Sequence, residues 1–239
     1  MFIQILTLFP EMFEGPFRHS ILKRAQEQKL VEFNFINFRD FTTDKHRMVD
    51  DTPYGGGSGM VLKPEPIYKA LCYAKELQPN SLVILLTPQG AVFKQETARE
   101  LAKNDHLIFI CGHYEGFDER IRAWVDLELS IGDFVLTGGE LATMVVSDAV
   151  VRLLPGVLGS EESAIHDSFT ENLLDYPQYT RPVEFDGMRV PDILLSGHHA
   201  QIEAWRRQEA ILRTAGRRPE LLDKAPLTIQ EKQMLNNNK

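Results

Sequence analysis

Short apolar runs alternate with amphipathic helical patterns along most of the chain, from the first residues to about Gly159. The runs that predict strands are Phe2–Leu8, Ser81–Leu86 and His106–Cys111, with a half-exposed edge strand at Val31–Asn37. The helical patterns lie at Ser20–Lys29, Pro64–Glu76, Lys94–Lys103 and Gly139–Leu154. Such alternation is typical of a mostly parallel sheet covered by helices, so residues 1–159 predict one α/β domain.

The composition changes after this domain. Residues 160–195 carry eight acidic and two basic side chains, and three prolines interrupt any regular pattern. We interpret this segment as a linker with a short helix, which the capping box of Ser168 and Glu171 would begin. Helical periodicity over Gln201–Ala215, ended by Gly216, and a second capping box at Thr228 predict a small helical domain at the end of the chain.

The charge of the chain is unevenly distributed. The net charge of −8 argues, as an average, against a nucleic-acid partner. By segment it is −5 over residues 1–159, −6 over 160–195 and +3 over 196–239. Arg206 and Arg213 are seven residues apart and share a helix face away from Trp205 and Leu212, so they could bind phosphates. Charge alone favours a solvated helix face over this alternative.

The sequence favours a cytoplasmic protein without a membrane segment or a protein-bound metal. Cys72 and Cys111 are too few for a disulfide framework, and neither has a Cys or His at metal-ligand spacing. The apolar start MFIQILTLFP lacks a basic region and stops at Pro10, which is typical of a buried strand rather than a signal peptide. No apolar run approaches the roughly 18 residues that span a bilayer.

Glycines gather in four segments, of which three adjoin the ends of predicted strands. The segments are DDTPYGGGSGM (50–60), LTPQG (86–90), GHYEGFDER (112–120) and SIGDFVLTGGE (130–140). The glycine signatures of dinucleotide sites and P-loops are missing from the sequence. Open α/β sheets bind ligands at the ends of their strands, and the last three segments, which lack lysine, suit an adenine-type ring better than a triphosphate. For any one segment, a tight turn is a better explanation than a ligand site. For the three segments together, the two explanations are about equal.

Further motifs lie between and after these segments. They are RLLPGVLG (152–159), DSF (167–169), YTRP (179–182), LLSGHH (194–199) and the tail RRPELL (217–222). Together with the glycine segments, and in this order, they resemble the bacterial tRNA (guanine-N1)-methyltransferase family of the SPOUT class. The resemblance covers nearly the whole chain, with mild departures at Phe134, where a tyrosine is common, and at Ala142, where a proline is common.

The resemblance implies a SPOUT-type, mostly parallel sheet with a deep trefoil knot and a small all-helical C-terminal domain. Residues 1–159 would be the knotted domain that binds S-adenosyl-L-methionine, 160–195 an interdomain linker or lid, and 196–239 the helical tRNA-binding domain. It also implies a homodimer that shares its active sites across the interface, with the linker of one subunit over the cofactor of the other.

The resemblance also names the residues of each site. Those implied at the cofactor are Leu86, Thr87, Pro88, Gly112, Tyr114, Glu115, Gly116, Ser130, Ile131, Gly132, Asp133, Phe134, Val135, Leu136, Gly138 and Gly139. Those expected at the RNA are Asp50, Arg206, Arg213, Arg217 and Arg218. The family's reaction is assisted by Mg²⁺, for which we expect no protein site.

Methylation of guanine at N1 needs two chemical groups. N1 holds a proton at neutral pH, so a base must remove it, and a cationic or donor group must stabilise the charge that moves onto O6. The resemblance assigns these roles to Asp167 and Arg152, on the guanosine immediately 3′ of the anticodon. Without the resemblance, Asp167 is better explained by a helix N-terminus and Arg152 by a surface position. Glu115, implied at the cofactor, is also placed to pair with Arg120.

Two other functions stay open at this point. One is a non-catalytic RNA-binding relative, against which the presence of both Arg152 and Asp167 speaks. The other is a SPOUT methyltransferase that acts on the ribose 2′-oxygen of RNA, a reaction that needs no base for N1. That function would leave the DSF and YTRP motifs unexplained.

Overall fold

The computed structural model describes residues 1–159 and 167–237. The chain divides into two compact units, Met1–Gly159 and Ser160–Lys239. In the described part of the chain, no helix is long and apolar enough to cross a membrane.

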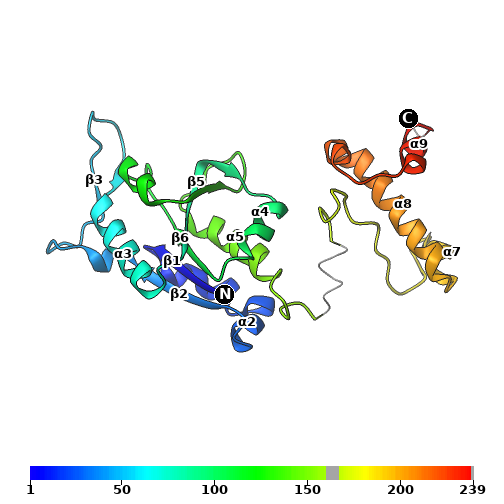
Figure 1. Cartoon of the computed structure of the whole chain (residues 1–239), viewed down its shortest axis with the longest axis horizontal. Helices are drawn as coiled ribbons and strands as arrows, with labels where there is room; N and C mark the ends of the chain where they lie inside the picture. The colour runs from blue at the N-terminus through cyan, green and yellow to red at the C-terminus, as the bar shows by residue number, and fades with distance from the viewer. Residues whose placement is uncertain (160–166, 238–239) are drawn as a thin grey trace. The chain divides into compact units, whose positions relative to one another are not determined.

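The first unit is built on a five-stranded sheet (Figure 1). Its strands are β1 (Phe2–Thr7), β2 (Glu32–Asn37), β5 (Leu82–Val92), β6 (His106–Ile110) and β7 (Leu127–Ser130). They lie in the order β2-β1-β6-β5-β7, and every neighbouring pair is parallel. The predicted parallel sheet and the edge position of β2 are thereby confirmed, while β7 was missing from the prediction.

Helices cover both faces of this sheet, because its central strands are apolar on both sides. One face packs against α3 (Pro64–Leu77), and the other against α2 (Ser20–Glu27), α4 (Gln95–Leu101) and α5 (Glu140–Val151) (Figure 1). In β6 the fully buried Leu107 and Phe109 face the second group of helices, and Ile108 and Ile110 face α3. This period of two is what a strand buried on both faces requires.

Short elements fill the connections of the first unit. They are η1 (Pro10–Phe13), α1 (Glu14–Phe17), η2 (Phe38–Phe41), β3 (Asp50–Asp51), β4 (Val61–Leu62) and η3 (Glu119–Trp124). The strands β3 and β4 form an antiparallel pair that joins Asp50 to Leu62, so the glycine-rich segment 52–60 is a loop between them.

The second unit is mainly helical in its described residues. It contains a hairpin of β8 (Glu184–Phe185) and β9 (Met188–Arg189), followed by α7 (Asp192–Leu195), α8 (His199–Arg217), η4 (Pro219–Asp223) and α9 (Ile229–Asn237). The second capping box is confirmed, since the Thr228 N–H donates to Glu231 Oε2 (2.7 Å) and the Glu231 N–H to Thr228 Oγ1 (3.2 Å). Gly216 lies inside α8, which ends before Pro219 instead, because a proline restricts the residue before it.

The first capping box gives a different result. Residues 167–172 form turns and no helix. The Ser168 hydroxyl accepts the N–H of Asp175 (3.0 Å), and Glu171 pairs with Arg207, so neither side chain makes a capping bond. The first residues of the predicted linker, 160–166, lie outside the described part of the chain.

Candidate functional site

A cavity of about 510 Å³ lies in the first unit, at the ends of β6 and β7 and beside the middle of β5. Its walls come from residues 86–89 of β5, from 112–117 after β6 and from 129–139 at and after β7. This is the edge of the sheet at which open α/β folds place ligands. The volume is in the range of small-molecule sites.

The residues expected at the cofactor gather around this cavity. All of them line it except Asp133, which is exposed between Gly132 and Phe134. The other lining residues, which were not expected there, are Gln89, His113, Phe117, Glu119, Arg122, Leu129, Thr137 and Ala142.

The first wall is an excursion of β5. The strand was predicted to end at Leu86, but it resumes pairing at Ala91, and both of these residues pair with Leu129 of β7. The four residues between them therefore leave the ladder. Gly90 permits this path, because a Cβ there would lie 2.5 Å from the backbone of Glu128 and Leu129.

The second and third walls are joined backbone to backbone. The Gly139 N–H donates to the carbonyl of Gly112 (2.9 Å), and His113 forms an isolated bridge with Gly138. A Cβ on Gly139 would lie 2.9 Å from the Cα of Cys111. Only glycine allows this approach, so the cavity's shape depends on that position.

A buried carboxylate lies directly behind these walls. Glu140, the first residue of α5, is fully buried. Its Oε1 accepts the hydroxyl of Thr7 (2.6 Å), and its Oε2 lies 2.8 Å from Nε2 of His113. The start of a helix favours a negative charge, and the two bonds satisfy both oxygens. Burial, reinforced by the charge of Glu140, raises the pKa of the Cys111 thiol well above its usual range.

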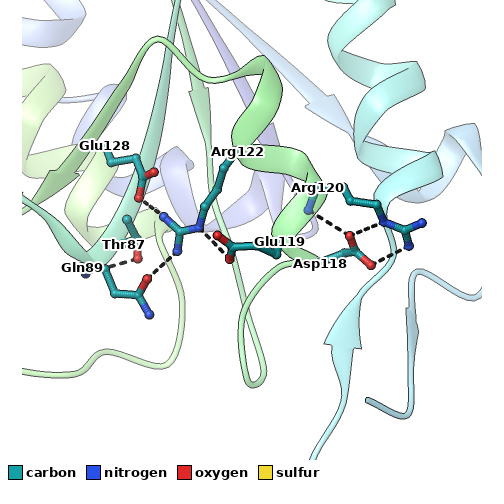
Figure 2. A network of polar contacts seen from close by, with 7 residues as sticks. All are labelled: Thr87, Gln89, Asp118, Glu119, Arg120, Arg122 and Glu128. Atoms are coloured by element: carbon teal, nitrogen blue, oxygen red, sulfur yellow. Dashed lines mark hydrogen bonds and ion pairs between the residues drawn. The ribbon is translucent and has the colours of Figure 1, made fainter. Parts of the chain in front are cut away.

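An arginine network borders the cavity on the side of η3 (Figure 2). Arg122 donates through Nε to Glu119 (2.9 Å), through Nη2 to the side-chain oxygen of Gln89 (2.6 Å), and through Nη1 to Glu128. The N–H of Gln89 donates to the hydroxyl of Thr87 (3.3 Å). This network was not predicted from the sequence, although the three-residue spacing of Glu119 and Arg122 in DERIR is typical of a pair on one helical turn.

In the segment GHYEGFDER, the structure shows which carboxylate pairs with Arg120 and which one lines the cavity. Arg120 pairs with Asp118 (2.7 Å), which depresses the pKa of that carboxyl, so the alternative pairing of Arg120 with Glu115 is wrong. Glu115 lines the cavity instead and packs against Gly59 of the β3–β4 loop, where its N–H donates to the carbonyl of Met60 (3.0 Å).

The two expected catalytic residues lie in different units, so neither unit by itself brings them together. Arg152 follows α5, and its N–H donates to the carbonyl of Asp148 (3.1 Å). Asp167 is the first residue of the turn 167–172, and its carbonyl accepts the N–H of Thr170 (3.3 Å). Because no helix starts at this turn, the helix N-terminus does not explain Asp167.

The arginines expected at the RNA have unequal surroundings on and after α8. Arg206 lies over the ring of Tyr176 (5.0 Å), and Arg213 donates to the carbonyl of Asp175 (3.4 Å). Arg217 is exposed, and Arg218 pairs with Glu220. The buried residues of α8 are Ile202, Ala210, Ile211 and Thr214, whereas Trp205 and Leu212 are half-buried. The predicted apolar stripe was therefore misplaced, and the side of Arg206 and Arg213 packs within the unit.

Arg207 makes ion pairs on α8 in addition to the arginines expected at the RNA. Arg207, for which no role was predicted, pairs with Glu231 (2.9 Å) and Glu171, and the pKa of Glu231 is lowered by the first of these contacts. Asp50 lies in β3. Within the two described ranges, no three His, Cys, Asp or Glu side chains are grouped so that they could hold a metal ion.

Comparison with known proteins agrees with the resemblance of the motifs. The profile of the family described as tRNA (Guanine-1)-methyltransferase TrmD matches residues 1–224. A tRNA (guanine-N(1)-)-methyltransferase of Staphylococcus carnosus (strain TM300) is 56% identical over 242 residues, which cover 100% of this chain and 98% of the relative. The protein of the same name from Staphylococcus aureus (strain JH9) is 56% identical over 240 residues, with the same coverage. The chain belongs to the tRNA (guanine-N1)-methyltransferase family.

Proposed function

We propose that this protein transfers a methyl group from S-adenosyl-L-methionine to N1 of the guanosine immediately 3′ of the anticodon in tRNA, at position 37. The observation that carries the proposal is the cavity at the ends of β6 and β7 and beside the middle of β5, around which nearly all residues expected at the cofactor gather. Membership of the family supplies the reaction class.

The walls of the cavity fit this cofactor. Leu86, Ile131 and Leu136 offer apolar contacts to an adenine ring, and the backbone at Gly112 and Gly139 leaves room for close approach. In the proposed fold, these segments belong to a deep trefoil knot. The close backbone approach of Gly139 to Cys111 and Gly112 supports it.

The proposed chemistry needs one base and one cation from this chain. When bound, the cofactor supplies a methyl group already activated by its sulfonium. Asp167 accepts the N1 proton of guanine, and Arg152 stabilises the negative charge that moves onto O6. The remaining task of the protein is to hold donor and acceptor in line.

The proposed enzyme is a homodimer in which Asp167 acts across the interface. The placement of Arg152 and Asp167 in different units supports this arrangement. Leu141 and Val145, four residues apart on α5, are exposed apolar side chains suited to contact with a second copy. Mixing Asp167→Ala subunits with subunits disabled at Gly112 is expected to restore activity in the heterodimer. No recovery would contradict a shared site.

The second unit is proposed to bind the tRNA in the cytoplasm. Its support is the excess of basic residues over 196–239 and the exposure of Arg217. Mg²⁺ is proposed to assist the reaction without a dedicated protein site.

Methylation of tRNA transcripts with labelled cofactor tests the proposal. We expect N1-methylguanosine when guanosine follows the anticodon, and no label when another base stands there. Methyl on a ribose 2′-oxygen would indicate the other SPOUT reaction. A folded protein that binds tRNA without transferring methyl would indicate a non-catalytic relative.

A further inference from the structure

We propose that Arg122 is a positioning residue that holds the β5 wall of the cavity in its cofactor-binding shape. The inference rests on the proposed function, since it assigns a role within the same cavity. Its starting point is the excursion of β5: residues 87–90 lack ladder pairing to β7, and residues 87–89 of this stretch line the cavity.

Gln89 links this excursion to the rest of the unit. Its N–H donates to the hydroxyl of Thr87 within the excursion, and its side-chain oxygen accepts a hydrogen bond from Arg122 (2.6 Å). Figure 2 shows the side chain of Gln89 directed at the guanidinium of Arg122. A hydrogen bond from a charged donor is among the stronger kinds, so it is suited to fix a segment that lacks regular pairing.

Arg122 is held by one carboxylate of its own helix, η3, and by one of β7. Its Nε bonds Glu119 of η3, and its Nη1 bonds Glu128 of β7, the strand against whose backbone Gly90 packs. The guanidinium thus joins η3, β7 and the excursion with three different nitrogens. A lysine carries the same charge but lacks this planar fork, so it cannot serve the three partners in the same directions.

Arg120 provides a matched control on the same short helix. It bonds Asp118 through Nε and Nη2, its side chain is 69% exposed, and it does not line the cavity. Figure 2 shows this pair as a separate cluster beside the network of Arg122. Arg122→Lys and Arg120→Lys are therefore the same chemical change in two positions that differ in their link to the wall.

Calorimetric titration of the full-length protein with S-adenosyl-L-methionine tests the inference. We expect Arg122→Lys to raise the Kd by about tenfold, the order expected for loss of one hydrogen bond to a charged group. Arg120→Lys is expected to stay within about twofold of the unsubstituted protein, because it leaves the wall untouched. In steady-state assays, the KM for the cofactor should rise in Arg122→Lys more than kcat falls.

A double-mutant cycle separates positioning from general stability. If Arg122 acts through Gln89, the Arg122→Lys, Gln89→Met double variant should bind the cofactor about as weakly as the weaker single variant. Gln89→Met alone removes the link without changing η3 or β7, so it tests the inference even if Arg122→Lys is unstable. An unchanged Kd in Gln89→Met or in folded Arg122→Lys, or fully additive effects, would overturn the inference. An unsubstituted protein that binds no cofactor would instead overturn the proposed function on which it rests.

Discussion

Sequence patterns predicted the cavity of the first unit better than they predicted the charged side of the long helix in the second. In the first unit, residues singled out in three separate motifs come together around one cavity. In the second, Arg206 and Arg213 share a side of α8 as expected, but that side contacts Asp175 and Tyr176 of the same unit. Glycine segments at strand ends are constrained by the sheet, whereas a surface charge can equally bind RNA or its own chain.

The two tryptophans allow this comparison to be tested unit by unit. Trp124 ends η3 in the first unit, and Trp205 lies on α8 in the second. Single-tryptophan backgrounds, Trp205→Phe and Trp124→Phe, therefore report urea unfolding of one unit each. In these backgrounds, variants at the cavity should shift the unfolding transition that Trp124 reports. Variants on α8 should shift the one that Trp205 reports.

The largest effect is expected at Glu140. Glu140→Ala leaves the Thr7 hydroxyl and His113 Nε2 without their buried partner, so the free energy of unfolding reported by Trp124 should fall by about 3 kcal/mol. Glu100→Ala is the control, because Glu100 is an exposed partner of Lys103. A loss no greater than that of Glu100→Ala would show that the buried network does not hold the cavity.

The next effect is expected at Gly139. Gly139→Ala places a methyl group 2.9 Å from the Cα of Cys111, and backbone must move to accommodate it. The stability reported by Trp124 should fall by about 2 kcal/mol, as for other overpacked positions. Gly159→Ala, where nothing lies within 4 Å of the new Cβ, should be nearly neutral. Equal effects of the two variants would contradict the close backbone approach of the two walls.

In the second unit, the pair of Arg207 and Glu231 predicts a dependence on pH. The pKa of Glu231 is lowered by its bond to Arg207, so the folded state holds the carboxylate more strongly than the unfolded state does. The contribution is fully present above the ordinary range of glutamate, near 4.5, and is lost as the pH falls through the lowered value. Unfolding followed by Trp205 should give Glu231→Gln a lower free energy of unfolding than the unsubstituted protein at pH 7, and this difference should vanish in acid. A difference that persists in acid would exclude this linkage.

A smaller effect on RNA affinity distinguishes the arginines of α8. Arg217→Ala should weaken tRNA binding by about threefold and reduce the salt dependence by about one phosphate contact, without shifting the Trp205 transition. Arg213→Ala should shift that transition, because it removes the bond to the Asp175 carbonyl. Filter binding at several salt concentrations checks both variants. If Arg217→Ala leaves binding unchanged at every salt concentration, the RNA lies on another surface.

The smallest effect is a gain in stability. Gly216 lies inside α8 and has nothing within 4 Å of a built Cβ, so Gly216→Ala should stabilise the second unit by about 0.5 kcal/mol through helix propensity alone. The unfolding midpoint of Trp205 measures it. A loss of stability there would mean that Gly216 ends the helix, as its sequence position suggested.

The sequence predicts those features that local patterns encode. The buried strand Phe2–Thr7 and the edge strand Glu32–Asn37 follow from their apolar periods, and the Thr228 capping box forms as expected. The excursion of β5 was missed, because its path depends on the backbone of β7, some forty residues away in the sequence. The failed capping box at Ser168 has the same cause, since Asp175 and Arg207 compete for its two side chains.

The residues of the candidate site likewise separate into those that local patterns predict and those that depend on distant segments. The glycines indicate the walls of the cavity in the sequence, because a close approach of backbone to backbone requires glycine whichever segment the partner is. Glu140 and Arg122 were missed because a charged side chain reveals its burial or its partners only once distant segments are packed. Arg152 and Asp167 were assigned by resemblance, and their joint action remains part of the proposed function.

Cofactor binding by the Gly139→Ala variant is the sharpest test of whether this cavity holds the cofactor. The full-length protein and Gly139→Ala should be titrated calorimetrically with S-adenosyl-L-methionine, with Gly159→Ala as the folded control. We expect the unsubstituted protein and Gly159→Ala to bind the cofactor alike, and folded Gly139→Ala to lose binding, because the close approach of its walls is displaced. Unchanged affinity in Gly139→Ala would contradict the assignment of this cavity as the cofactor site.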